Sequence, residues 1–233
     1  MAADSRRGYT KTGSNVESFD DSGCKIAVLP GETVFTAAGI LGRTGRRWTA
    51  ASEAVAAAEH IIQSRRMERS EGDSVLERWA QAMMQKLAEF SKEQLVAYAD
   101  ANEGKLVTGI LGGTEGEGVV WLHAVTISYP LSYQGYTLTS LDPPTAYYVL
   151  GKAEIFTEFE KDQKSERAVA ERKNWDRMKL TGVAFDQFKT RRLVELTAIH
   201  HRNKLDVGGP IDVIEIDASG PHWLALKRDC RDK

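Results

Sequence analysis

The chain has 233 residues and a formal net charge of −2, with 42% hydrophobic and 27% charged residues. This composition is ordinary for a globular protein and excludes collagen and intrinsic disorder. The length allows one large domain or two small ones, and we expect a single domain over residues 1–233. No apolar run of about eighteen residues offers a membrane span, and the balanced charge gives no reason to expect nucleic acid as a partner.

The first part of the chain predicts a loop followed by a hairpin. Residues 8–23 are polar and rich in turn formers, which indicates an exposed loop. Two short apolar runs follow, at 25–29 and 33–38, and residues 30–32 (Pro-Gly-Glu) separate them. Two apolar runs around such a turn are typical of a β-hairpin.

The next segments have helical periodicity. Between about 47 and 65 the chain is rich in alanine, and apolar residues recur at steps of three and four. A second helix is predicted to begin at Asp73 or Ser74, which are good N-cap residues. Ser91 is followed three residues later by Gln94, and this pair predicts a capping box at the start of a third helix.

The middle of the chain predicts strands around a glycine-rich stretch. Residues 106–111 and 119–127 are strand-like, and the stretch 112–118 between them contains four glycines. Such a stretch can hold phosphate, but no Lys-Ser/Thr pair follows it and a strand comes next, so we expect a hairpin tip. A further strand is expected over 145–150.

The last part of the chain predicts a block of helices and then a block of strands. A short helix is expected at 154–160, a solvated helix or mobile segment at 161–180 and a strong helix at 183–201. Strands are expected at 211–216 and 223–226. Because strands and helices come in blocks rather than alternating, the order favours an α+β fold with antiparallel sheets over a doubly wound one.

Several short motifs resemble those of the proteasome-type N-terminal nucleophile (Ntn) hydrolases. Residues 2–6 (Ala-Ala-Asp-Ser-Arg) are similar to the end of a strand that carries the family's acidic residue, and Lys25 begins a strand similar to its catalytic-lysine strand. Gly39 follows Lys25 by fourteen residues, the spacing of the family's oxyanion glycine, and residues 208–210 resemble a late Gly-Gly turn. The resemblance implies a four-layer αββα sandwich of two antiparallel sheets flanked by helices, with the first strand missing.

The resemblance also implies a set of catalytic roles. The nucleophile would be an N-terminal Thr, Ser or Cys about seventeen residues before Asp4. Lys25 would lower the pKa of both its hydroxyl and its α-amine, Asp4 would hold Lys25 charged, and Gly39 would donate to the oxyanion. Arg6 would brace Asp4. Taken singly, these residues also fit a surface ion pair, an edge-strand charge and a turn.

These roles lead to two functional hypotheses. The first is an Ntn-hydrolase domain of amide- or peptide-bond hydrolase ancestry, similar to bacterial proteasome-like proteins of unassigned activity. Its nucleophile is absent from residues 1–233, so it is a threonine-type peptidase or amidohydrolase only if the true N-terminus lies upstream. The second is a non-catalytic assembly subunit with the same fold. Both predict a homo-oligomer, either a dimer or a ring, and an active form would take a peptide or amide substrate.

No cofactor and no metal are expected. The five histidines are scattered without a metal-binding pattern, and no Gly-x-Ser-x-Gly motif marks a serine nucleophile, although a Ser-His-Asp triad stays open. Cys24 is interpreted as a small buried residue, with a disulfide to Cys230 left open. No signal peptide follows Met1, so the cytoplasm is the expected compartment, and a leader upstream of this start stays open.

Overall fold

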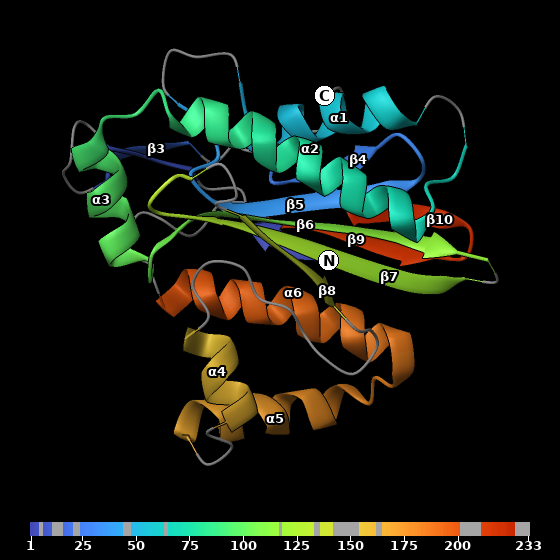
Figure 1. The fold of residues 1–233 in the computed structure, drawn as a ribbon. Coiled ribbons are helices and arrows are strands. Elements are labelled where there is room, and N and C mark those ends of the chain that lie inside the picture. The colour runs from blue at the N-terminus through green and yellow to red at the C-terminus, as the bar shows by residue number, and fades with distance from the viewer. Residues whose placement is uncertain are drawn as a thin grey trace.

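The computed structural model describes most of the chain and defines strands and helices in the blocks that the sequence predicts (Figure 1). The described residues are 1–4, 7–10, 16–20, 24–43, 48–62, 65–116, 118–132, 136–141, 154–161, 165–200 and 211–226. The strands are β1 (Ala2–Asp4), β2 (Arg7–Thr10), β3 (Val16–Asp20), β4 (Ile26–Leu29), β5 (Thr33–Gly39), β6 (Lys105–Glu115), β7 (Val119–Ser128), β8 (Tyr136–Leu141), β9 (Ile211–Asp217) and β10 (Gly220–Ala225). The helices are α1 (Ala50–Ile61), α2 (Arg69–Leu87), α3 (Lys92–Ala101), α4 (Glu154–Lys161), α5 (Glu166–Met178) and α6 (Gly182–His200).

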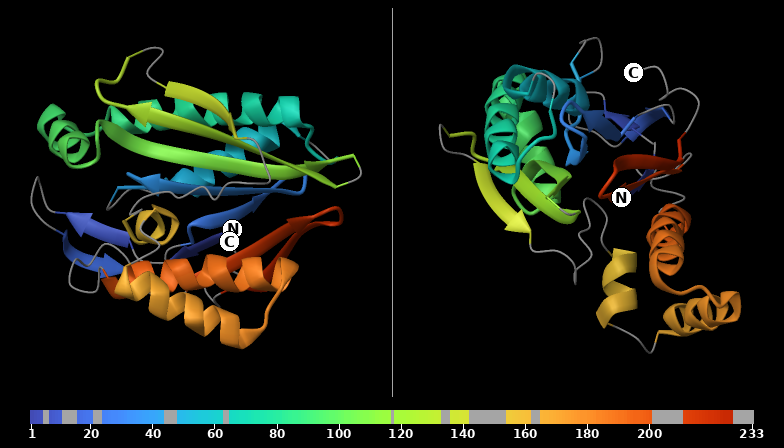
Figure 2. Two further views of the ribbon diagram at one scale, coloured as in Figure 1. Left: turned by 90° about the horizontal axis from the view of Figure 1, so that it is seen from below. Right: turned by 90° about the vertical axis from the view of Figure 1, so that its right-hand side faces the viewer.

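Two antiparallel sheets form the centre of the molecule. One has the order β4-β5-β6-β7-β8 and the other has the order β1-β9-β10, while β2 and β3 form a separate two-stranded ribbon. Helices α1 and α2 cover one face of the five-stranded sheet, the three-stranded sheet lies against its other face, and α6 lies against β1 and β9 (Figures 1 and 2). The expected α+β class with antiparallel sheets is therefore confirmed.

The larger core lies between the five-stranded sheet and the helices above it. Trp79 of α2 is fully buried, donates its indole N–H to the carbonyl of Ala50 over 2.8 Å and packs against Phe35 of β5 at a ring distance of 5.2 Å. Gly109 of β6 makes room for both rings, because a Cβ there would lie 2.9 Å from each. Buried alanines on α1 let that helix approach closely, as its alanine-rich sequence predicts.

A smaller apolar cluster fills the space between the two sheets. Ile26, Val34 and Ile214 are buried in it, and partly buried Met1 and Trp223 pack against them. The Met1 α-amino group donates to the carbonyl of Ile214 over 2.6 Å, and its burial lowers its pKa below the usual value. Main-chain and apolar contacts therefore hold β1 against β9 and against the larger sheet.

The three helices of the C-terminal half have their own core. Phe159 of α4 stacks on Trp175 of α5 at 5.4 Å, and Leu193 and Leu196 of α6 complete a cluster with Ile155. The charged segment 161–180, expected to be a solvated helix or mobile, contains helix α5. Its few apolar residues suffice because α4 and α6 cover it on one side.

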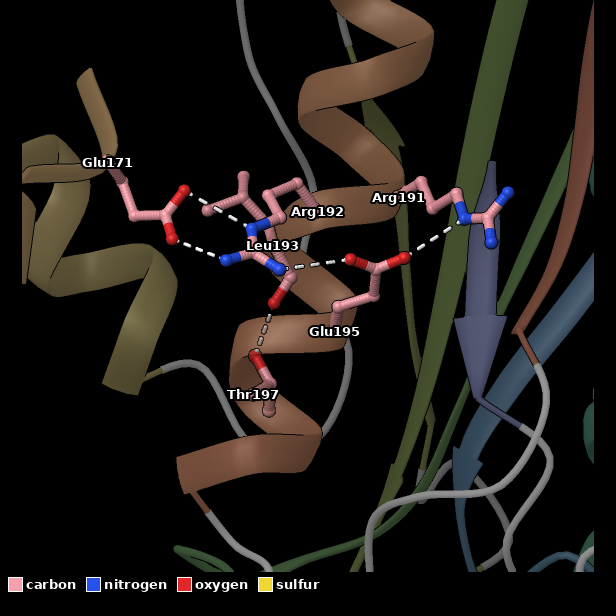
Figure 3. Close-up of polar contacts among 6 residues, drawn as sticks. All are labelled: Glu171, Arg191, Arg192, Leu193, Glu195 and Thr197. Atoms are coloured by element: carbon pink, nitrogen blue, oxygen red, sulfur yellow. Dashed lines mark hydrogen bonds and ion pairs between the residues drawn. The ribbon is translucent and has the colours of Figure 1, made fainter. Parts of the chain in front are cut away.

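Charged side chains join α5 to α6 at the surface of this layer (Figure 3). Arg192 donates to both carboxylate oxygens of Glu171, one of them through Nε at 3.2 Å, and to Glu195 at 3.2 Å. Arg191 reaches the other oxygen of Glu195 at 3.0 Å. The hydrogen bonds to Glu171 are the main cause that raises the pKa of Arg192, and its guanidinium therefore stays charged at neutral pH.

Arg192→Ala should therefore destabilise the α5–α6 layer. Bidentate charged contacts that are partly shielded from water are worth about 1–3 kcal/mol, and urea denaturation should show a loss of this size in the free energy of unfolding. Arg191→Ala is the matched control, because Arg191 is more exposed and, among the described residues, contacts only Glu195. This substitution should lower the free energy of unfolding by less than about 1 kcal/mol. Equal losses for the two variants would contradict a special role for Arg192.

Three local expectations from the sequence are wrong. Residues 8–23 contain the β2–β3 ribbon rather than a plain loop, because Tyr9, Val16 and Phe19 supply good strand formers among the polar residues. Helix α2 begins at Arg69 and not at 73 or 74, since the Glu71 side chain accepts a hydrogen bond from the Glu68 N–H at 2.9 Å and closes the first turn. Strand β8 was not expected, and the strand expected at 145–150 lies outside the described residues.

The last wrong expectation concerns Cys24, which is disulfide-bonded rather than a free buried thiol. The sequence has one other cysteine, Cys230, which lies outside the described residues. The bond places a covalent constraint immediately before Lys25. Disulfides persist mainly in oxidising compartments. The cytoplasmic location therefore stays a prediction, and this bond is a reason to test it.

Candidate functional site

The orientation of the two sheets follows from contacts at the tips of their hairpins. A Cβ at Gly220, in the β9–β10 turn, would lie 3.5 Å from the carboxylate of Glu32, in the β4–β5 turn. A Cβ at Gly118, in the β6–β7 turn, would lie 2.8 Å from that of Ala218. Strand β9 therefore ends over the tips of both hairpins of the larger sheet.

The expected catalytic residues lie toward the opposite end of the stack. Asp4 ends β1 and pairs with Ile211 at the start of β9, which is the end away from the hairpin tips. Lys25 immediately precedes β4, and Gly39 closes β5, so both also lie at that end. The structure describes the backbone of Asp4 but not its side chain, and Arg6 lies outside the described residues.

Lys25 lies beside the beginning of helix α1. It is half-buried and lines a shallow depression together with Ala37 and Ala50. The next residue, Ile26, belongs to the cluster between the sheets, whereas Ala27 packs on the helix side. Lys25 alternates with Ile26 and so lies on the helix side of the sheet, the face opposite the one that the smaller sheet covers, and Gly39 is not among the described residues that line its depression.

Gly39 is required by the backbone around it. Its φ is +114°, and a Cβ there would lie 2.4 Å from the carbonyl oxygen of Leu106 and 2.7 Å from the Cα of Val107. The same carbonyl accepts a hydrogen bond from the Ile40 N–H at 2.9 Å. The close approach of β5 and β6 explains this glycine whether or not its own N–H has a catalytic role.

Gly39→Ala should therefore be strongly destabilising. Both the positive φ and the contact with Leu106 oppose a side chain, so the free energy of unfolding should fall by about 3 kcal/mol or more. Gly104→Ala separates the effect of the positive φ from the effect of crowding, because Gly104 has φ +80° but open space around it. This substitution should lower the free energy of unfolding by about 1–2 kcal/mol. Denaturation that gives the same loss at both positions would show that crowding at Gly39 is unimportant.

A second polar constellation lies on β7, with strands β5 and β6 between it and β4, and was not found from the sequence. His123 of β7 has an exposed fraction of only 2%. Its Nδ1 is hydrogen-bonded to Asp73 of α2, and its Nε2 accepts from the Nε–H of Arg69 at 3.3 Å. Arg69, Asp73 and His123 line an open depression of about 410 Å³ with Ser70 and Glu115.

The sequence held one signal for this constellation. Strand β7 alternates, and His123 falls on the same buried face as Trp121 and Val125. A polar ring on that face needs partners, but the expected helix start at 73 or 74 left Arg69 outside the helix. The partners are 50 and 54 residues away, and periodicity carries no information at that separation.

A Ser-His-Asp group occurs in the β9–β10 turn, but its geometry is that of a turn. Asp217 accepts from the backbone N–H and the hydroxyl of Ser219, at 2.7 and 2.6 Å, and His222 Nε2 lies 2.7 Å from the same hydroxyl. The hydrogen bond from the Ser219 side chain is the main cause that lowers the pKa of Asp217. In a catalytic triad the carboxylate orients the imidazole through Nδ1, whereas here it binds the serine.

Within the part of the chain that the structure describes, no group of three or more His, Cys, Asp or Glu residues is arranged to hold a metal ion. Among the described helices, none combines the length and apolar character that a bilayer crossing requires. No protein-family model and no curated protein sequence matches the chain.

Proposed function

We propose that this chain is a proteasome-type Ntn-hydrolase domain of amide- or peptide-bond hydrolase ancestry. The observation that carries the proposal is that Asp4, Lys25 and Gly39 reach the same end of the stack, although they come from three strands of two sheets. The order of layers, helix, sheet, sheet and helix, supports it, because the resemblance at residues 2–6, 25 and 39 implies that architecture.

The proposed chemistry needs a nucleophile that Met1 does not provide, since methionine has neither a hydroxyl nor a free thiol. An upstream Thr, Ser or Cys with a free α-amine would act as nucleophile and base together. Lys25 would lower the pKa of both groups, because its ammonium favours their less positive forms, and Asp4 would hold Lys25 charged. The N–H of Gly39 would stabilise the oxyanion by about 3 kcal/mol. This chemistry requires no cofactor.

The test is hydrolysis by a chain that carries the codons preceding Met1 in its gene. If those codons supply a strand that begins with Thr, Ser or Cys, the processed protein should cleave fluorogenic peptide amides. Lys25→Ala should then reduce kcat/KM by at least about 10³-fold, because the nucleophile loses the charge that activates it. Circular dichroism should show an unchanged fold.

The matched control is Lys105→Ala. Lys105 lies at the start of β6 and pairs with Glu103 at 3.0 Å on the surface, so its loss should leave turnover unchanged. Unchanged turnover in Lys25→Ala would remove Lys25 from the mechanism, and an in-frame stop codon directly before Met1 would remove the hydrolase.

A non-catalytic assembly subunit is the second candidate, and the outer helical layer favours it. Val183 and Ile199, at the two ends of α6, have exposed fractions of 60% and 53%, and Val169 and Met178 of α5 are also exposed. Val183 and Ile199 lie about 24 Å apart along α6, so a partner that buries both would have to cover the whole layer. A second copy of the chain is the expected partner, in a dimer or a ring.

The double substitution Val183→Asp and Ile199→Asp should therefore shift the chain toward monomers. Sedimentation velocity across a concentration series measures the change, which should be at least tenfold in the dissociation constant. Val119→Asp is the control: Val119 is 67% exposed but belongs to β7, away from this layer. A wild-type chain that is monomeric at every concentration would contradict the assembly subunit without bearing on hydrolysis.

A further inference from the structure

The buried imidazole of His123 is enclosed between strand β7 and the first turns of helix α2. Its ring meets the edge of the Trp121 ring at 5.3 Å, and Trp121 is in turn fitted against Gly72 of α2 and Gly113 of β6. A Cβ at either glycine would lie within 2.8 Å of the indole. The packing around His123 therefore leaves its ring little freedom to rotate.

The hydrogen bonds define which nitrogen of His123 carries the proton. Arginine has only N–H donors, so the Nε–H of Arg69 requires a lone pair on His123 Nε2. The proton of the neutral ring therefore lies on Nδ1, where the Asp73 carboxylate accepts it. Neutral His123 thus links an anion to a cation, both from α2.

Among the described residues, three charged groups line the depression with His123. Helix α2 contributes Arg69 and Asp73, and β6 contributes Glu115 at the rim of the same depression. In the neighbouring strand β8, the residue paired with His123 is Ser140, which carries no charge. An added proton has one position available, Nε2, because Nδ1 already holds one.

We propose that Asp73, His123 and Arg69 form an acid-sensitive latch on the first turn of α2. A solvent proton that binds Nε2 turns this acceptor into a donor and puts a positive ring against a guanidinium that stays charged. Asp73 retains the imidazolium, so the group that leaves is Arg69. Its departure frees the start of α2 and widens the depression of about 410 Å³ that Arg69 lines. This inference does not depend on the proposed function.

The test on the wild-type chain is an NMR titration from about pH 8 to pH 5. Long-range proton–nitrogen correlations should show His123 protonated at Nδ1 only at neutral pH, and the Arg69 Nε–H signal should be protected from exchange. When Nε2 gains its proton, the Arg69 signal should disappear and amide exchange at 70–72 should rise at least tenfold. The exposed His60 of α1 is the internal reference, and its titration should leave Arg69 unchanged.

Two substitutions provide a second test of the latch. Asp73→Asn removes the carboxylate that retains the imidazolium, so release of Arg69 should require a proton concentration about tenfold higher or more. Asp100→Asn, an exposed carboxylate on α3, should have no effect. The latch is refuted if Nε2 is protonated at neutral pH, if Arg69 stays protected after His123 titrates, or if both variants behave alike.

Discussion

The architecture depends on a constraint in the two central strands of the larger sheet, which have no polar face. Along β5, Val34 packs between the sheets and Phe35 packs under the helices, and both are buried. Strand β6 is buried at nearly every position between its two ends. A sheet that is apolar on both faces must be covered twice, so helices α1 and α2 cover one side and the second sheet covers the other.

Close packing in these layers is achieved by placing glycines opposite tryptophans. Gly109 accommodates Trp79, and Gly72 and Gly113 accommodate Trp121 on its two sides. This explains why the glycine-rich stretch 112–118 is only partly a turn. Gly112 and Gly113 belong to β6, whereas Gly116 and Gly118, with positive φ, form the tip. Composition alone suggests a loop here, because it does not show that large rings lie against the strand.

Local signals in the sequence predicted the elements that local interactions determine. The hairpin at 25–38 and the box in which Ser91 and Gln94 cap α3 are confirmed, because turn residues and cap side chains act within a few positions. The start of α2 was misplaced because a glutamate is an unusual N-cap residue. The block order predicted two antiparallel sheets, and from their register Asp4, Lys25 and Gly39 come to one end.

Local sequence signals could not predict the contact between Asp73 and His123. It joins a helix to a strand through the packing of Trp121, and that packing depends on the whole five-stranded sheet being assembled. Lys25 and His123 therefore lie in different surroundings. Lys25 lies at the edge where β4 begins, next to a disulfide, whereas His123 lies beneath α2 near the hairpin tips. His123 is level with Ala27, two residues along from Lys25, and strands β5 and β6 lie between the two groups. Two intervening strands keep Lys25 and His123 out of direct contact, so substitutions at the two sites should act additively.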